Sequence, residues 1–213
     1  TVVFADCDFD STVKQVVTAS FANQGEICLC GSRIFVERSI YEKFRDAFVA
    51  RVSELKVGDP NEDASNLGAI VSLPHKEKIL SYIQLAQEEG GKVLCGGNEV
   101  KLSGRCADGY FIEPTVIEGL DYLCRTQQEE IFGPVVTLTP FDTEEEALAM
   151  ANSVKYGLAS SVWTNDLKKA HRVAEKIEAG IVWINCWLLR DLRTPFGGVK
   201  ASGVGREGGW EAL

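Results

Sequence analysis

Cys28 is a residue whose type and place in the chain suit covalent chemistry. It follows a helix-like stretch that ends at Gly25, and it precedes the predicted strand Arg33–Val36. A loop thiol near backbone amides can have its thiolate stabilised, and an exposed thiolate attacks carbonyl carbons readily. The chain has seven cysteines, however, and buried unreactive thiols are common. Position alone therefore makes Cys28 a candidate and no more.

The remaining cysteines and the two histidines show no pattern of a metal site or a disulfide framework. Seven is an odd number, and no C-x-x-C pair occurs among them. His75 and His171 lie far apart, and no thiols flank them at the spacing of a zinc site. The sequence thus predicts reduced thiols in a cytoplasmic setting and no bound metal.

The glycine-rich segment Pro195–Gly209 is a second functional candidate, because its glycines favour tight turns or a close backbone approach. Gly203, Gly205 and Gly208 fit the spacing G-x-G-x-x-G. That fingerprint binds a dinucleotide when it follows the first strand of a βαβ unit and has an acidic partner downstream. Here it follows a loop, so we interpret the match as coincidental.

Composition and charge narrow the class of protein. The 213 residues are 45% hydrophobic and 25% charged, which predicts one globular domain with its own core. A net charge of −9 with scattered Lys and Arg disfavours nucleic-acid and anionic-membrane partners. No apolar run reaches the length of a membrane span, and the acidic start is unlike a signal peptide. We therefore expect small-molecule or protein partners.

The elements that must position Cys28 alternate between short apolar segments and amphipathic ones, which predicts an α/β fold. We expect an open, mostly parallel twisted sheet with helices on both faces. The predicted strands are Val2–Ala5, Arg33–Val36, Lys92–Cys95, Val135–Thr139, Ala159–Thr164 and Ile181–Asn185. The predicted helices are Ser39–Leu55, Pro74–Glu89, a helix from Asp142 to about Asn152, and Asp166–Ile177.

Three further motifs occur in order along the chain. They are F-x-N-x-G-E-x-C at Phe21–Cys28, E-E-I-F-G-P-V at Glu129–Val135, and P-F-G-G-x-K-x-S-G-x-G-R-E at Pro195–Glu207. Together they resemble the aldehyde dehydrogenase family. Shorter matches at Lys56–Pro60, Glu113–Val116 and Tyr156–Ala159 extend the resemblance over nearly the whole chain. A related acyl-phosphate reductase also uses a cysteine, but the E-E-I-F-G-P motif argues against that alternative.

The resemblance implies a role for several residues. Cys28 would attack the aldehyde carbon and form a thiohemiacetal and then a thioester, while Cys30 would be a bystander. Glu130 would accept hydrogen bonds from the nicotinamide ribose, and Phe132 would pack beside the nicotinamide ring. The implied cofactor is NAD, with NADP not excluded. Without the resemblance, Glu130 would be interpreted as a solvated carboxylate and Phe132 as core filling.

The segment Asn185–Gly198 contains arginines where many family members carry apolar residues at the aldehyde entrance. Its L-R-D-L-R-T-P-F-G-G pattern resembles the branch that oxidises 2-aminomuconate or 2-hydroxymuconate semialdehyde. The resemblance implies that Arg190 grips a substrate carboxylate, because a guanidinium binds carboxylates bidentately. The substrate side would also include Phe196, Ile27 and Leu29. The alternative is that one of the two arginines forms a surface ion pair with Asp191, and Arg193 is better placed for this than Arg190.

The family's general base lies in an E-L-G-G-K segment that this sequence does not contain. We therefore expect residues 1–213 to be the cysteine-bearing catalytic domain, with the NAD-binding domain and the C-terminal tail absent. Alone, such a domain should not turn over aldehyde, and the parent enzyme should be a homo-oligomer. The alternative is a non-catalytic fold or interaction module in which the thiol is incidental.

Overall fold

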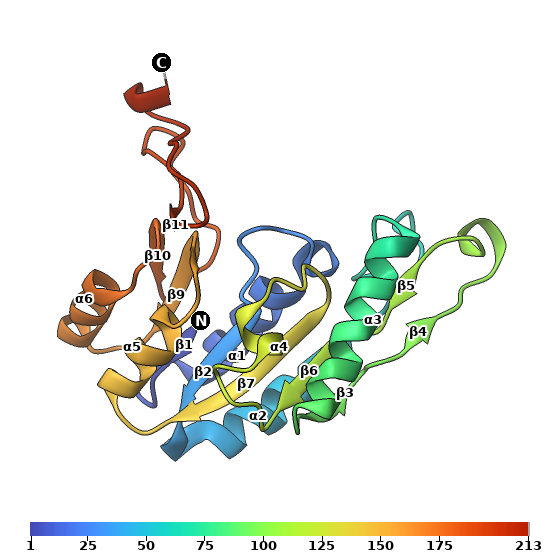
Figure 1. Ribbon diagram of the computed structural model, residues 1–213, viewed down its shortest axis with the longest axis horizontal. Coiled ribbons are helices and arrows are strands. Elements are labelled where there is room, and N and C mark those ends of the chain that lie inside the picture. Colours follow the sequence, from blue (N-terminus) through green and yellow to red (C-terminus); the bar gives the residue numbers. More distant parts are fainter. Residues whose placement is uncertain (213) are drawn as a thin grey trace.

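A seven-stranded sheet organises the chain, which we describe from a computed structural model over residues 1–212 (Figure 1). From one edge to the other its strands run in the order β10-β9-β1-β2-β7-β6-β3. All neighbours are parallel except β3 and β6. The bounds are β1 Val2–Val3, β2 Arg33–Glu37, β3 Lys92–Cys95, β6 Thr115–Glu118, β7 Val135–Phe141, β9 Ala159–Trp163 and β10 Ile181–Ile184.

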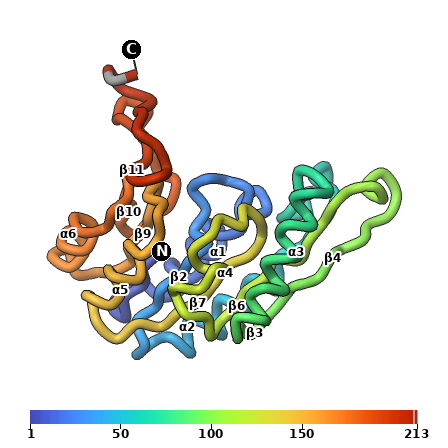
Figure 2. Tube along the Cα trace, in the orientation of Figure 1, coloured from blue at the N-terminus to red at the C-terminus, as the bar shows by residue number. Residues whose placement is uncertain are grey.

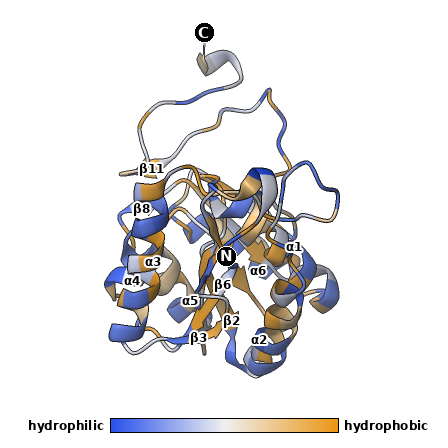
Figure 3. Cartoon of the chain, turned by 90° about the vertical axis from the view of Figure 1, so that its right-hand side faces the viewer, coloured by the Kyte–Doolittle hydropathy of each residue, from blue (hydrophilic) through white to orange (hydrophobic). Residues whose placement is uncertain are grey.

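Helices cover both faces of this sheet, as the sequence predicts. On one face lie α1 and α2, and on the other lie α3, α5 and α6. Figure 3 shows the apolar strands between these layers. The helix bounds are α1 Phe9–Phe21, α2 Arg38–Ser53, α3 Leu73–Glu88, α4 Arg125–Gln128, α5 Glu144–Asn152 and α6 Leu167–Lys176. Single 3₁₀ turns are η1 Ala22–Gly25, η2 Gly104–Cys106 and η3 Trp210–Ala212.

Strand β2 shows why the central strands are apolar throughout. Ile34 and Val36 pack against α1 and α2, whereas Phe35 packs against α5 and α6. Successive side chains of a strand point to opposite faces, so a strand covered on both sides has no solvent-facing position. All three side chains are at most 1% exposed. The apolar runs of the sequence therefore mark the buried middle of the sheet.

Helix starts follow the capping signals in the sequence. The Ser72 hydroxyl accepts a hydrogen bond from the His75 amide, and Pro74 occupies the first turn of α3. Thr143 and Asp166 cap α5 and α6 in the same way. Such caps fix where each helix begins, and thereby which side chains of its first turns face the neighbouring loops.

The structure corrects some predicted bounds. Strand β1 ends at Val3, short of the predicted Ala5, because the chain turns there and the Cys7 amide bonds the Phe4 carbonyl. Strand β7 is longer than predicted and reaches Phe141. Strand β6 and four two-residue strands were not predicted, and the two-residue strands are too short for a periodic signal. These four are β4 Glu99–Val100, β5 Phe111–Ile112, β8 Tyr156–Gly157 and β11 Val199–Lys200.

The segment after β10 leaves the sheet and extends away from the layered body (Figures 1 and 2). Strand β11 pairs with β8, and a further bridge joins Phe196 to Glu207. Several large apolar side chains are exposed along this segment, among them Leu189, Leu192 and Trp210. Within residues 1–212, none of the helices is both long and apolar enough to cross a bilayer.

Candidate active site

The loop that carries Cys28 connects α1 to β2 through a run of left-handed backbone. Asn23, Gln24 and Gly25 have φ angles of 49°, 46° and 74°. Asparagine and glycine tolerate this region better than other residues. The Asn23 carboxamide donates to the Glu26 carbonyl at 3.1 Å, and the Glu26 amide donates to the Asn23 carbonyl at 2.9 Å. The loop is thus held by its own polar groups.

Bonds on the far side of Cys28 fix the loop to the end of α1. The Cys30 amide donates to the Ile27 carbonyl at 2.9 Å, so Cys28 lies within a tight turn. The Gly31 amide donates to Ala19 at 3.0 Å, and the Ser20 hydroxyl donates to the Gly31 carbonyl at 3.0 Å. Anchored at both ends, the turn presents the Cys28 side chain to solvent.

Cys28 differs from the other thiols in its exposure. Burial raises the pKa of the other six, and it raises those of Cys30 and Cys124 to about 11. The Cys30 thiol also donates to the Ala22 carbonyl at 3.6 Å. A thiol with so high a pKa stays protonated near neutral pH and is a poor nucleophile. These observations support Cys28 over Cys30 as the reactive sulfur.

The segment 129–133 lies directly against the Cys28 loop. A Cβ atom placed on Gly25 would be 2.1 Å from the Gly133 carbonyl oxygen, so the two backbones touch. Phe132 has a φ of 61°, a left-handed conformation that bulky residues rarely adopt. Such strain persists only where surrounding contacts hold it. The side chain of Glu130 is exposed at this surface.

Helix α3 supplies those contacts. The Lys78 ammonium donates to the Glu130 carbonyl at 2.7 Å. The His75 Nε2 lies 2.6 Å from the Phe132 carbonyl oxygen. The Tyr82 hydroxyl donates to the Glu129 carboxylate. Because successive turns of one helix hold this segment, its backbone is fixed on the side opposite to the Cys28 loop.

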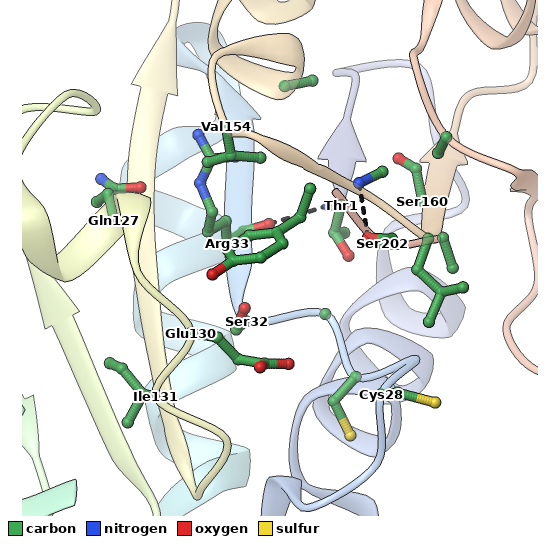
Figure 4. A pocket seen from close by; sticks show the side chains of 18 of the residues that line it. Thr1, Cys28, Ser32, Arg33, Gln127, Glu130, Ile131, Val154, Ser160 and Ser202 are labelled. Atoms are coloured by element: carbon green, nitrogen blue, oxygen red, sulfur yellow. Dashed lines mark hydrogen bonds between the residues drawn. The ribbon is translucent and has the colours of Figure 1, made fainter. Parts of the chain in front are cut away.

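One cavity of about 410 Å³ brings most of the predicted site residues together. Its walls include Ile27, Cys28, Glu130 and Phe132, and the half-buried Arg33 also lines it. In Figure 4 the Glu130 side chain projects toward the side of the cavity where Cys28 lies. Such a volume suits the reacting end of a small molecule. Cys28, Glu130 and Phe132 thus line one space.

This cavity lies at the amino ends of β2 and β7, since Cys28 and Phe132 both precede their strands. Ligands of open α/β sheets usually bind beyond the carboxyl ends. The general rule would therefore have placed the site at the wrong edge. Here the two loops that enter neighbouring strands form the site.

The other predicted substrate residues lie outside this cavity. The Leu29 side chain is buried, and its carbonyl accepts a hydrogen bond from the Trp187 indole at 2.9 Å. The Arg190 guanidinium lies 4.0 Å from the Phe196 ring centroid and 3.4 Å from a Glu207 carboxylate oxygen. Arg190 and Phe196 thus contact each other in the segment after β10, and the Trp187 bond joins that segment to the Cys28 loop.

Arg193 pairs with Asp191, as the sequence analysis expected for one of the two arginines. The pair is bidentate: Nε donates to one carboxylate oxygen at 2.9 Å, and Nη2 donates to the other at 2.5 Å. The Arg193 side chain is 90% exposed. A surface ion pair of this kind contributes little to stability. Arg190 has no carboxylate partner as near as this, since its distance to Glu207 is 3.4 Å.

Three residues at the site had no predicted role. Arg33 lies beside the cavity, where its guanidinium donates to the Met150 carbonyl at 2.7 Å and the Ser153 hydroxyl at 2.9 Å. Burial lowers the pKa of Arg33 to about 10. Glu26 and His75 lie behind the two loops and contact each other. Glu26 was visible within the first motif, but its partner is 49 positions away in sequence.

Among residues 1–212, no group of three or more potential ligands could hold a metal ion.

Comparison with known proteins gives a consistent result. The model of the aldehyde dehydrogenase family matches residues 1–213. The 2-aminomuconic semialdehyde dehydrogenase of Mus musculus is 50% identical over 97% of the chain. The 2-hydroxymuconic semialdehyde dehydrogenase of Pseudomonas putida is 47% identical over all of it. The chain spans 43% and 44% of these two relatives.

Two solved structures share the fold of this chain. A betaine aldehyde dehydrogenase from Staphylococcus aureus, solved in complex with NAD+, has a TM-score of 0.94 and 41% identity. HpcC from Thermus thermophilus has a TM-score of 0.95 and 42% identity. Both matches cover the whole chain and 42% of the other protein.

Proposed function

The chain belongs to the aldehyde dehydrogenase family, as its three motifs predict, and from this we propose that it oxidises an aldehyde to a carboxylic acid through Cys28. In this proposal residues 1–213 are the cysteine-bearing catalytic domain. The observation that carries it is the shared cavity of an exposed Cys28 thiol, Glu130 and Phe132. Nucleophile and cofactor-binding groups must meet in one space for this reaction.

The proposed chemistry begins with the Cys28 thiolate. Its sulfur forms a bond to the aldehyde carbon, and the carbonyl π electrons move to oxygen, giving a thiohemiacetal oxyanion. The backbone amide of Cys28 can donate a hydrogen bond to that oxyanion. Loss of hydride from the carbon re-forms the carbonyl as a thioester, and water then releases the acid and the thiol.

NAD, when bound, supplies the hydride acceptor. Two residues fit its nicotinamide end. The Glu130 carboxylate offers two acceptor oxygens for a ribose diol, and it projects into the cavity (Figure 4). Phe132 lines the same cavity, and its side chain offers an aromatic face for a flat ring. Neither residue would reach the adenosine ribose, whose 2′ position distinguishes NAD from NADP, so both residues fit either cofactor.

We further infer that the substrate is a carboxylated semialdehyde. Relatives that are 50% and 47% identical to this chain are named for muconic semialdehydes. Arg190 offers a guanidinium whose contact to Glu207 is 3.4 Å, which is longer than a good charged hydrogen bond. A substrate carboxylate could replace so weak a partner. In this proposal Arg190, with Phe196 beneath its guanidinium, binds the substrate carboxylate.

The complete reaction needs more than these residues. The chain spans less than half of the length of its curated relatives. In this proposal the base and the rest of the NAD site lie in a part of the complete enzyme outside residues 1–213. A homo-oligomeric parent enzyme in a reducing, cytoplasmic compartment completes the proposal. No nucleic acid, membrane or metal is needed for this chemistry.

The experiment that tests the function uses the complete enzyme that contains this chain. We expect NADH to form from 2-hydroxymuconate semialdehyde, and Cys28→Ser to abolish it. Cys30→Ser is the matched control, because Cys30 lines the same cavity but keeps its proton, and it should retain most activity. Equal activity of wild type and Cys28→Ser would leave the thiol incidental, as in a non-catalytic module.

A further inference from the structure

The Glu26 carboxylate joins two segments that are distant in sequence, the Cys28 loop and the start of α3. One oxygen accepts a hydrogen bond from the Gln24 side chain at 3.1 Å within the Cys28 loop. The other accepts from the Val71 amide at 3.3 Å, just before α3. The side chain is only 8% exposed. A buried carboxylate is retained where its oxygens are satisfied, so Glu26 fixes the loop to the start of α3.

His75 continues this connection toward the Phe132 segment. Its Nε2 atom lies 3.5 Å from the Glu26 carboxylate and 2.6 Å from the Phe132 carbonyl oxygen. A carbonyl can only accept, so Nε2 carries the hydrogen and donates it. The neighbouring carboxylate favours the positive end of that N–H dipole. His75 is 17% exposed, which limits competition from water.

The bond to the Phe132 carbonyl fixes a strained backbone. Phe132 has a φ of 61°, and without a partner its carbonyl could turn to a less strained orientation. Rotation of that peptide would also move Gly133, which touches Gly25. The His75 and Phe132 rings lie edge to face, with centroids 6.2 Å apart. One histidine therefore controls the peptide plane and the position of the aromatic ring.

We propose that Glu26 and His75 are positioning residues that lock the nicotinamide-facing Phe132 to the loop of the nucleophile. The proposal rests on the proposed function, since it assumes that Phe132 packs beside the cofactor. Neither side chain needs to touch substrate or cofactor. Their contribution is to hold two loops from different parts of the chain in one fixed arrangement, so that the reacting carbon and the cofactor ring are aligned.

The test is made in the complete enzyme with His75→Ala and His75→Gln. We expect His75→Ala to raise the Kd of NAD, measured by fluorescence titration without aldehyde, by about tenfold, as for one lost hydrogen bond. The rate of Cys28 alkylation without cofactor and the melting temperature should stay near the wild-type values. His75→Gln should restore NAD affinity, because its amide nitrogen can occupy the place of Nε2. The matched control is His171→Ala on the exposed face of α6.

A double-mutant cycle tests whether the two residues act as one unit. If they do, Glu26→Ala weakens NAD binding as His75→Ala does, and the double variant is no weaker than the worse single variant. Wild-type NAD affinity in His75→Ala, or simple addition of the two effects, would overturn the proposal. A wild-type enzyme that binds NAD but makes no NADH from any aldehyde would instead refute the proposed function.

Discussion

Replacing Gly25 by alanine would push the Cys28 loop away from the segment that carries Phe132. Gly25 has a φ of 74°, and an added Cβ would lie 2.1 Å from the Gly133 carbonyl oxygen. Cβ atoms essentially never approach other heavy atoms within 3.0 Å. The opposing atom is backbone, which cannot rotate out of the way as a side chain can. The two segments must therefore separate by about 1 Å.

The cost of this change has two parts. A left-handed backbone costs an alanine about 1–2 kcal/mol, and forcing packed groups apart costs about 1–3 kcal/mol more. Gly104→Ala is the matched control, because Gly104 has a φ of 63° but an added Cβ would meet nothing within 4 Å. Only the first cost applies there. The difference between the two variants isolates the contact between the loops.

Two assays follow these variants. Urea denaturation of the chain should show Gly25→Ala losing more free energy of unfolding than Gly104→Ala. In the complete enzyme, a displacement of about 1 Å between nucleophile and cofactor should lower kcat by about 100-fold. Equal loss of stability in the two variants, or near wild-type kcat in Gly25→Ala, would mean that the loops do not depend on this contact.

Three further predictions concern single groups. The 213-residue chain alone should make no NADH, yet iodoacetamide at pH 8 should label Cys28 first, as peptide mass spectrometry can show, because burial raises the pKa of the other six thiols. In the complete enzyme, Arg190→Ala should raise the KM of a carboxylated semialdehyde by about tenfold and leave that of an uncharged aldehyde unchanged, while the control Arg193→Ala affects neither. Hydrogen bonds from Arg125 and then Tyr82 lower the pKa of Glu129 from 4.5 to about 2, so the stability that Glu129 contributes is present above pH 4.5 and is lost as the pH falls toward 2. Glu129→Gln should therefore flatten the loss of stability over that range in urea titrations, and an unchanged acid profile would contradict this assignment.

Much of the fold could be predicted because its signals are local. The apolar run at Arg33–Val36 is buried on both faces, and the Asp166 cap marks the start of α6. Strand β6 was missed because it lies between Pro114 and Gly119, which suggest a loop. Its place in the sheet depends on pairing with β7, and a contact between distant strands cannot be predicted from a local sequence pattern.

The site divides in the same way. Cys28, Glu130 and Phe132 were named from their motifs, and the structure brings them to one cavity. The bond from His75 to the Phe132 carbonyl spans 57 residues, and no spacing rule connects them. His75 was considered only as a metal ligand, so its role as a donor to strained backbone went unrecognised. Tertiary contacts to main-chain atoms leave no trace in side-chain motifs.

The glycine contact also restricts how such an enzyme could open and close. Because the Gly25 and Gly133 backbones touch and α3 holds the second segment from behind, neither loop can swing without disturbing the other. The two loops therefore form a rigid wall of the cavity. Substrate entry and product release must therefore depend on movement of other parts of the enzyme. Mutations that alter these two steps should lie outside the two loops.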